Sequence, residues 1–211
     1  MEIALIRPVA PFNRYIQNVP LNYIHLAAYL REHGHKTRIL DMVVEDSTDV
    51  VDNYIRDNAV KIAGIGCMTC ELPDALAEAQ RLKEVHPGIK IVFGGAHPSA
   101  DPEECLKSGV VDYVVVGEGE IPLVALMDAL EEGREPTGIL GLWSLENGHI
   151  SGSTSAAIPN VEELPMPAYD LLELEKYFQL DSPWHFPKSK KAVQYVSSRG
   201  CPYHCSYCHT I

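Results

Sequence analysis

The fold is decided by a short apolar run that ends in two glycines, Ile89-Lys90-Ile91-Val92-Phe93-Gly94-Gly95. Apolar and β-branched residues over five positions, bounded by glycine, predict a buried β-strand. The small and polar residues that follow, up to Ser99, predict a loop.

The same unit, a short apolar strand followed by an amphipathic helix, occurs five times along the first part of the chain. The expected strands cover residues 3–6, 37–40, 62–66, 89–93 and 113–116. The expected helices cover residues 21–32, 49–57, 73–85, 102–108 and 121–132. Five such units predict an α/β fold, with a doubly wound, flavodoxin/Rossmann-like parallel five-stranded sheet and helices on both of its faces.

Ligands of doubly wound sheets bind outside the carboxyl ends of the strands, near the point where the strand order reverses. Four loops follow expected strands and are rich in glycine, proline and small polar residues. They cover residues 7–12, 67–71, 94–99 and 117–120. We expect the binding site to be formed by these four loops.

The composition changes after Gly133. Residues 138–145 and 148–151 predict two strands around the turn Glu146-Asn147-Gly148. Several prolines and an expected short helix over residues 171–178 then predict an ordered linker. We therefore divide the chain into an α/β domain (1–136), a hairpin and proline-rich linker (137–190) and the start of a further domain (191–211).

Composition excludes several classes of protein. The 211 residues carry a net charge of −12, which disfavours nucleic acid and anionic membranes as partners. No apolar run approaches the roughly 18 residues that span a bilayer, and the N-terminus does not resemble a signal peptide. Six cysteines in such a chain indicate metal or redox chemistry rather than disulfides, so we expect a cytoplasmic protein.

Three of the cysteines form a C-x-x-x-C-x-x-C array, Cys201, Cys205 and Cys208. An expected strand over residues 192–196 and the pair Arg199-Gly200 precede it. Closely spaced thiolates suit zinc or an iron–sulfur cluster. Three thiols leave one position open, whereas structural zinc sites are normally closed by four ligands. A zinc site completed by His204 or His209, or thiols without a ligand, are the alternatives.

This array resembles the cluster loop of the radical S-adenosylmethionine (radical SAM) enzymes, in which an aromatic residue precedes the third cysteine, as Tyr207 does here. The resemblance implies that Cys201, Cys205 and Cys208 bind three irons of a [4Fe-4S] cluster. It also implies that the fourth iron binds S-adenosyl-L-methionine, beside Tyr207, and that reduction yields a 5′-deoxyadenosyl radical. An electron donor such as flavodoxin or ferredoxin would be needed.

Residues 2–135 resemble the cobalamin-binding domain that precedes many radical SAM barrels. The resemblance rests on three segments: residues 26–35, Phe93-Gly94-Gly95-Ala96-His97-Pro98 and Val116-Gly117-Glu118-Gly119-Glu120.

The resemblance implies roles for individual residues. Gly94 and Gly95 would let a bulky group lie on the backbone, and Thr69 would offer its hydroxyl to the nucleotide tail of cobalamin. Gly117 and Glu118 would border the ligand, and His97 would line the pocket. The cobalt-ligating Asp-x-His-x-x-Gly of other cobalamin proteins is absent, since Pro8-Val9-Ala10-Pro11-Phe12 stands at its position.

We therefore expect the N-terminal part of a cobalamin-dependent radical SAM enzyme that transfers a methyl group to an unactivated carbon of a small-molecule substrate. The chain ends three residues after Cys208, so we expect a truncated barrel without activity of its own. No catalytic acid or base can be assigned.

Two alternative functions and the role of one cysteine pair remain open. The chain could be a stand-alone corrinoid-binding module with a zinc or vacant cysteine site, or a flavodoxin-like regulator with an empty cleft. Separately, Cys67 and Cys70 form a C-x-x-C that is either a redox pair or two half-buried residues at a pocket edge.

Overall fold

The computed structural model describes residues 1–10, 18–45, 47–146, 148–156, 160–180, 191–201 and 203. Cys205, Tyr207 and Cys208 lie outside these residues, as do the two histidines considered as zinc ligands and the last two residues of the loop over residues 7–12.

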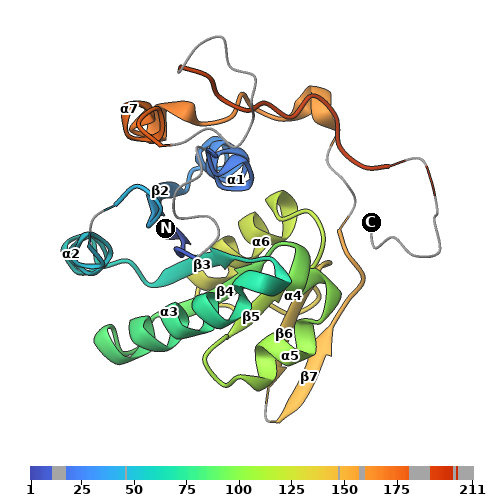
Figure 1. The fold of residues 1–211 in the computed structure, drawn as a ribbon. Coiled ribbons are helices and arrows are strands. Elements are labelled where there is room, and N and C mark those ends of the chain that lie inside the picture. Colours follow the sequence, from blue (N-terminus) through green and yellow to red (C-terminus); the bar gives the residue numbers. More distant parts are fainter. Residues whose placement is uncertain are drawn as a thin grey trace.

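A seven-stranded sheet forms the centre of the molecule, in the order β2-β1-β3-β4-β5-β6-β7 (Figure 1). The first five strands are parallel. The strands are β1 Glu2–Arg7, β2 Lys36–Asp41, β3 Ile62–Gly66, β4 Lys90–Gly94, β5 Tyr113–Val115, β6 Leu142–Glu146 and β7 His149–Gly152. The doubly wound parallel sheet predicted from the apolar runs is confirmed.

Helices cover both faces of this sheet, because alternate strand residues point to opposite sides. In β1, Ala4 and Ile6 belong to a core with α2, α3 and α5, whereas Ile3 and Leu5 belong to a core with α1 and α6. The helices are α1 Leu21–Glu32, α2 Asp49–Asp57, α3 Leu72–Val85, α4 Ala96–Ala100, α5 Pro102–Lys107, α6 Glu120–Glu131 and α7 Leu174–Tyr177. Short 3-10 helices are η1 Thr69–Glu71, η2 Val161–Glu163 and η3 Tyr169–Leu171.

The β6–β7 hairpin corrects the expected strand number from five to seven. Its two strands occur where the sequence predicts them, but β6 pairs antiparallel with β5, for example Val114 with Trp143. The hairpin thereby covers an edge of β5 that would otherwise expose unpaired backbone groups. The division of the chain at residue 136 stays a prediction, although the hairpin that follows it belongs to the sheet.

The segment that we call the C-terminal strip, residues 160–180 and 191–201, runs along α1 on the side away from α3 and α5 (Figure 1). Ala168 is fully buried in it and donates its backbone N–H to the carbonyl of Ile24 in α1 at 3.0 Å. The expected helix over residues 171–178 is shorter, since η3 and α7 are separate.

Two further local predictions are wrong. Residues 192–196 form no strand, because a strand exists only by pairing and no strand of the described residues lies beside them. The loop expected over residues 94–99 contains the short helix α4. None of the helices in the described part of the chain is long and apolar enough to cross a bilayer.

Candidate functional site

A cavity of about 630 Å³ lies at the carboxyl ends of β1, β3, β4 and β5. All four loops expected from the sequence contribute to it, with Arg7, Cys67, Gly94 and Gly117 among the lining residues. The start of α1 forms another wall. Val196, Arg199 and Gly200 of the C-terminal strip also line the cavity, which the sequence did not predict.

Gly95 allows two of these loops to touch. Its φ of +96° and ψ of −167° fall in a region that only glycine adopts readily. A Cβ at this position would meet the carbonyl oxygen of Cys67 at 3.1 Å and its nitrogen at 3.2 Å. Close contact between the β3 and β4 loops therefore requires glycine here, and the backbone of both loops reaches the cavity.

Gly117 turns the chain sharply after β5. Its φ is +82°, and a Cβ would lie 2.8 Å from the Cβ of Ser155. Its backbone N–H donates to the hydroxyl of Ser99 at 3.0 Å, which ties the turn to α4. The turn brings Glu118, Gly119 and Glu120 to the rim of the cavity.

Thr69 and His97 are brought together, but they are not among the residues that line the cavity. The Oγ1 of Thr69 lies 3.2 Å from Nδ1 of His97, and Nε2 of His97 lies 3.2 Å from a carboxylate oxygen of Glu104. Glu104 thus lies beside the buried imidazole, although Nε2 makes no hydrogen bond of good geometry with it. The sequence selected Thr69 and His97 but not Glu104.

Tyr23 sets the spacing of the strand ends beneath the cavity. Its buried hydroxyl donates to the carbonyl of Ile6 at 2.9 Å and accepts from the N–H of Gly66 at 2.7 Å. Burial raises the pKa of Tyr23, so it remains a neutral donor. The sequence did not single out Tyr23, because no local pattern shows that its hydroxyl reaches two strand ends.

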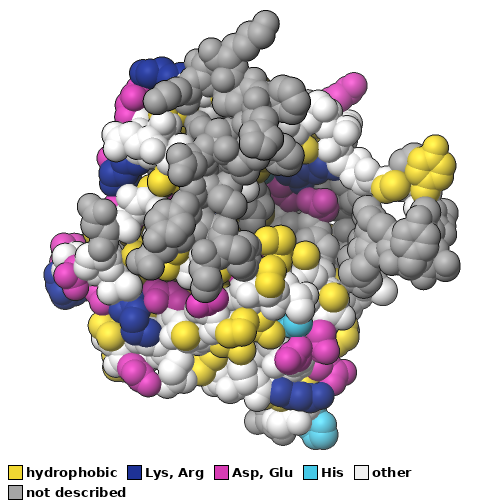
Figure 2. Space-filling view, in the orientation of Figure 1, with side chains coloured by type: hydrophobic (Ala, Val, Ile, Leu, Met, Phe, Trp, Pro, Cys, Tyr) yellow, Lys and Arg dark blue, Asp and Glu magenta, His cyan; other side chains and the backbone are white. Residues whose placement is uncertain are grey.

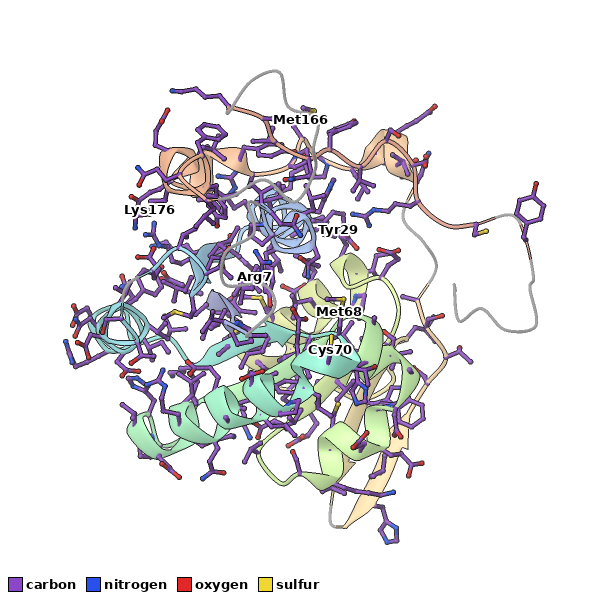
Figure 3. All side chains as sticks on the ribbon, viewed as in Figure 1. Arg7, Tyr29, Met68, Cys70, Met166 and Lys176 are labelled. Atoms are coloured by element: carbon purple, nitrogen blue, oxygen red, sulfur yellow. The ribbon has the colours of Figure 1, made fainter. Side chains whose placement is uncertain are left out.

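Arg7 carries a positive charge into the cavity wall. Its Nη1 donates to Oδ2 of Asp41 at 3.2 Å and to the carbonyl of Asn18 at 2.7 Å. The hydroxyl of Tyr177 donates to the same Asp41 oxygen at 2.7 Å, and burial raises the pKa of this tyrosine. Figure 3 shows Arg7 and Met68, both cavity-lining residues, between α1 and the strand ends.

The opposite rim is acidic and is paired with the C-terminal strip. Nη1 of Arg199 lies 2.9 Å from Oε2 of Glu118 and 2.6 Å from Oε1 of Glu120. Burial raises the pKa of Glu118, an effect that Arg199 opposes. Burial and then the charge of Arg199 lower the pKa of His25, another lining residue. Only Glu118 of this group was selected from the sequence.

The cysteines fall into distinct environments. Cys67 is buried, and burial raises its pKa to about 12, while Cys70 is exposed. Cys67 thus lacks the acidic thiol of a thioredoxin-like pair, which favours the interpretation as a residue at the pocket edge. Cys201 is exposed, two residues beyond Arg199.

Basic side chains on the face seen in Figure 2 lie in small groups beside acidic ones rather than in one patch.

Comparison with known proteins identifies the domain. The chain matches the B12 binding domain family over residues 9–127. It is 35% identical over 217 residues to an uncharacterized methyltransferase of Pyrococcus horikoshii, covering 99% of this chain and 45% of that protein. It is 31% identical over 193 residues to an anaerobic magnesium-protoporphyrin IX monomethyl ester cyclase of Rubrivivax gelatinosus, covering 87% of this chain and 33% of that protein. The chain thus spans less than half the length of these relatives.

Solved structures share the fold. The cobalamin-dependent S-adenosylmethionine radical enzyme OxsB, with aqua-cobalamin and S-adenosylmethionine bound, superposes with a TM-score of 0.78 at 21% identity, covering 98% of this chain and 28% of that one. The radical S-adenosylmethionine methyltransferase TsrM of Kitasatospora setae, with cobalamin and a [4Fe-4S] cluster bound, superposes with a TM-score of 0.64 at 20% identity. The match covers 79% of this chain and 31% of that one. These likenesses confirm the predicted cobalamin-binding type of sheet. The family match, which covers more than half of the residues, shows that the chain belongs to the B12 binding domain family.

Proposed function

We propose that this chain holds cobalamin in the cavity at the strand ends and a [4Fe-4S] cluster with S-adenosyl-L-methionine on Cys201, Cys205 and Cys208, as part of a methyltransferase. One observation carries the proposal. Arg199 and Gly200, the residues just before Cys201, line the same cavity as the strand-end glycines. Two cofactors that must react together would thus be bound on adjoining surfaces.

The lining of the cavity is suited to a corrinoid. Gly94, Gly95 and Gly117 present backbone where side chains would fill space, and a Cβ on Gly94 would meet only one atom within 4 Å, at 3.9 Å. Among the described lining residues His25 is the single imidazole, and its Nε2 is shielded from solvent. This agrees with the absence of Asp-x-His-x-x-Gly, so the chain would bind the corrin by shape and hydrogen bonds.

Polar groups at the two rims would orient the ligand. Arg7 offers N–H donors on one side and Glu118 a carboxylate on the other, and the amide side chains of a corrin can pair with both kinds of group. Thr69, whose hydroxyl is oriented by His97, would hold the nucleotide tail beside the cavity. These residues bind and orient, and none of the described side chains is assigned to proton transfer.

The donor set suits an iron–sulfur cluster more than zinc. Closely spaced thiolates suit such a cluster, Cys201 is exposed, and Gly200 before it has a φ of +76°, a conformation that glycine adopts readily. When bound, the cofactors would supply reductive cleavage of S-adenosyl-L-methionine and a transferable methyl group. The substrate is proposed to be a small molecule, as the name of the relative from Rubrivivax gelatinosus, a magnesium-protoporphyrin IX monomethyl ester cyclase, states for that protein. The electron donor is proposed to be a flavodoxin or ferredoxin.

Anaerobic reconstitution tests the proposal. The purified chain is supplied with ferrous iron, sulfide and hydroxocobalamin, and iron, sulfide and corrinoid are measured after gel filtration. We expect all three in the wild type. The triple variant Cys201→Ala, Cys205→Ala, Cys208→Ala should lose iron and sulfide but keep corrinoid, whereas Cys70→Ala, at an exposed cysteine of the β3 loop, should keep everything.

Each other outcome selects an alternative. Corrinoid without iron, or with zinc bound instead, would favour a stand-alone corrinoid module. A hydroxocobalamin spectrum that stays unchanged at high protein concentration would favour a regulator with an empty cleft. Iron retained by the triple variant would contradict the assigned ligands.

A further inference from the structure

Arg199 is a charged residue in an unusually buried position. Its side chain is 11% exposed, and its Nη1 contacts two carboxylates, Glu118 and Glu120, that precede it by about eighty residues. The carboxylates belong to the turn after β5, whereas Arg199 belongs to the C-terminal strip. This ion triad therefore joins two segments that the local sequence does not relate.

Glu120 makes the pairing energetically necessary. Its side chain is 3% exposed, and Arg199 is its one ion-pair partner among the described residues. Its other oxygen, Oε2, is buried without a hydrogen bond in the described structure. A buried carboxylate that loses its counter-charge is strongly destabilising, because neither water nor another donor replaces the lost interaction.

The triad also determines where Cys201 lies. Only Gly200 separates Arg199 from Cys201, so the Cα atoms of the two residues lie no more than about 7 Å apart and the held guanidinium keeps Cys201 near the cavity rim. On the other side of the triad, Gly117 directs Glu118 and Glu120 to the cavity rim. One buried set of contacts thus restricts how far Cys201 can move from the cavity.

We propose that Arg199 is a positioning residue that fastens the segment carrying Cys201 to the cavity rim through Glu118 and Glu120. The role of Cys201 as a cluster ligand rests on the proposed function, but the fastening itself needs no cofactor. Its consequence is that Cys201 is held beside the cavity before either cofactor binds.

The first test measures the position of the charge in the cofactor-free chain. His25 lines the same cavity as Arg199 and Glu120, and both charges act on its pKa, so its titration by NMR reports on both. In Arg199→Gln the pKa of His25 should rise, because a nearby positive charge is removed and Glu120 is left unopposed. Lys191→Gln, which removes an exposed charge in the same strip, should leave it unchanged.

The second test measures the release of the strip. Chymotrypsin should cleave after Tyr195 at least about tenfold faster in Arg199→Gln than in the wild type, because loss of a charge-assisted contact shifts the local opening equilibrium by that order. In Lys191→Gln the rate should change less than about twofold, since exposed ion pairs contribute little. Arg199→Lys, which can still reach a carboxylate, should give an intermediate rate.

A further variant covers the case in which Arg199→Gln does not fold. In Arg199→Gln with Glu120→Gln no buried charge is left unpaired, so the sheet should fold while the strip still opens faster. Unchanged cleavage and an unchanged His25 pKa in these variants would overturn the proposal. A wild-type chain that binds no cluster would overturn the proposed function instead, because neither readout involves iron or corrinoid.

Discussion

The parallel sheet and the C-terminal strip are held by different kinds of contact. The sheet is stabilised by continuous backbone pairing and by two apolar cores, one on each face. The strip packs through Ala168, Tyr169 and Leu171 against the apolar core that contains α1 and α6, and elsewhere it is joined to the domain by single polar contacts that lie far apart. Examples are the N–H of Ala168 on α1, the hydroxyl of Tyr177 on Asp41 and the guanidinium of Arg199 on two glutamates.

This difference implies different responses to damage. Loss of one contact in a cooperative sheet lowers the stability of the whole domain, whereas loss of one contact in the strip allows a local opening. The cavity is lined by the loops at the strand ends, which we call its floor, and by the C-terminal strip. If the strip can open by itself, a large ligand can enter without unfolding of the sheet. The variants below test this division, starting with the largest expected effect.

The largest effect is expected at the floor, in Gly95→Ala. The strained backbone and the contact with Cys67 should cost ~3 kcal/mol of unfolding free energy. Gly133→Ala is the matched control, because Gly133 also has a positive φ, +68°, but nothing lies within 4 Å of an added Cβ. That variant should lose ~1 kcal/mol. Urea denaturation of both proteins measures the difference, and equal losses would show that the loop contact at Gly95 does not constrain the fold.

A smaller and more local effect is expected in the strip, in Tyr177→Phe. Removal of a buried hydrogen bond to a carboxylate should lower the free energy of opening the strip by ~2 kcal/mol. Asp41 keeps Arg7 and the N–H of Val43 as partners. Tyr169→Phe, which loses a neutral contact to the carbonyl of Gln194, should cost ~1 kcal/mol.

The division into floor and strip predicts how this loss appears. In Tyr177→Phe, the free energy of local opening, measured by proteolysis within residues 160–180, should fall more than the free energy of global unfolding, measured by the urea midpoint. A midpoint that falls as far as in Gly95→Ala would mean that strip and sheet unfold as one unit.

The smallest effect is a pH dependence that links the two regions. The folded pKa of His25 lies below its ordinary value, mainly through burial and further through Arg199. As pH falls below about 6.5, the unfolded chain binds a proton at His25 before the folded chain does. The unfolding free energy of the wild type should therefore decline with falling pH until the folded pKa is reached.

His25→Gln is the control for this prediction, since the other histidines of the chain remain in it. Its unfolding free energy, measured by urea denaturation from neutral pH downward, should decline less steeply. Identical slopes in the two proteins would show that His25 is not shielded in solution.

The elements of the sheet were predictable because each depends on neighbours within one segment. Apolar runs located the first five strands, and helical repeats with caps located α1, α2, α3, α5 and α6. The strand expected over residues 192–196 failed for the opposite reason: its pattern was suitable, but pairing requires a partner that no local pattern supplies. The hairpin was located correctly, whereas its pairing with β5 was not predicted.

The sequence by itself determined the βα repeats, the edge of the sheet where the cavity lies, and the spacing of the three cysteines. Only the tertiary structure decided which distant side chains meet there: Tyr23 with two strand ends, Glu104 with His97, and Arg199 with Glu120. The physical reason is range. Periodicity records the burial of one helix or strand, whereas a buried ion pair depends on how two segments separated by tens of residues come to lie against each other.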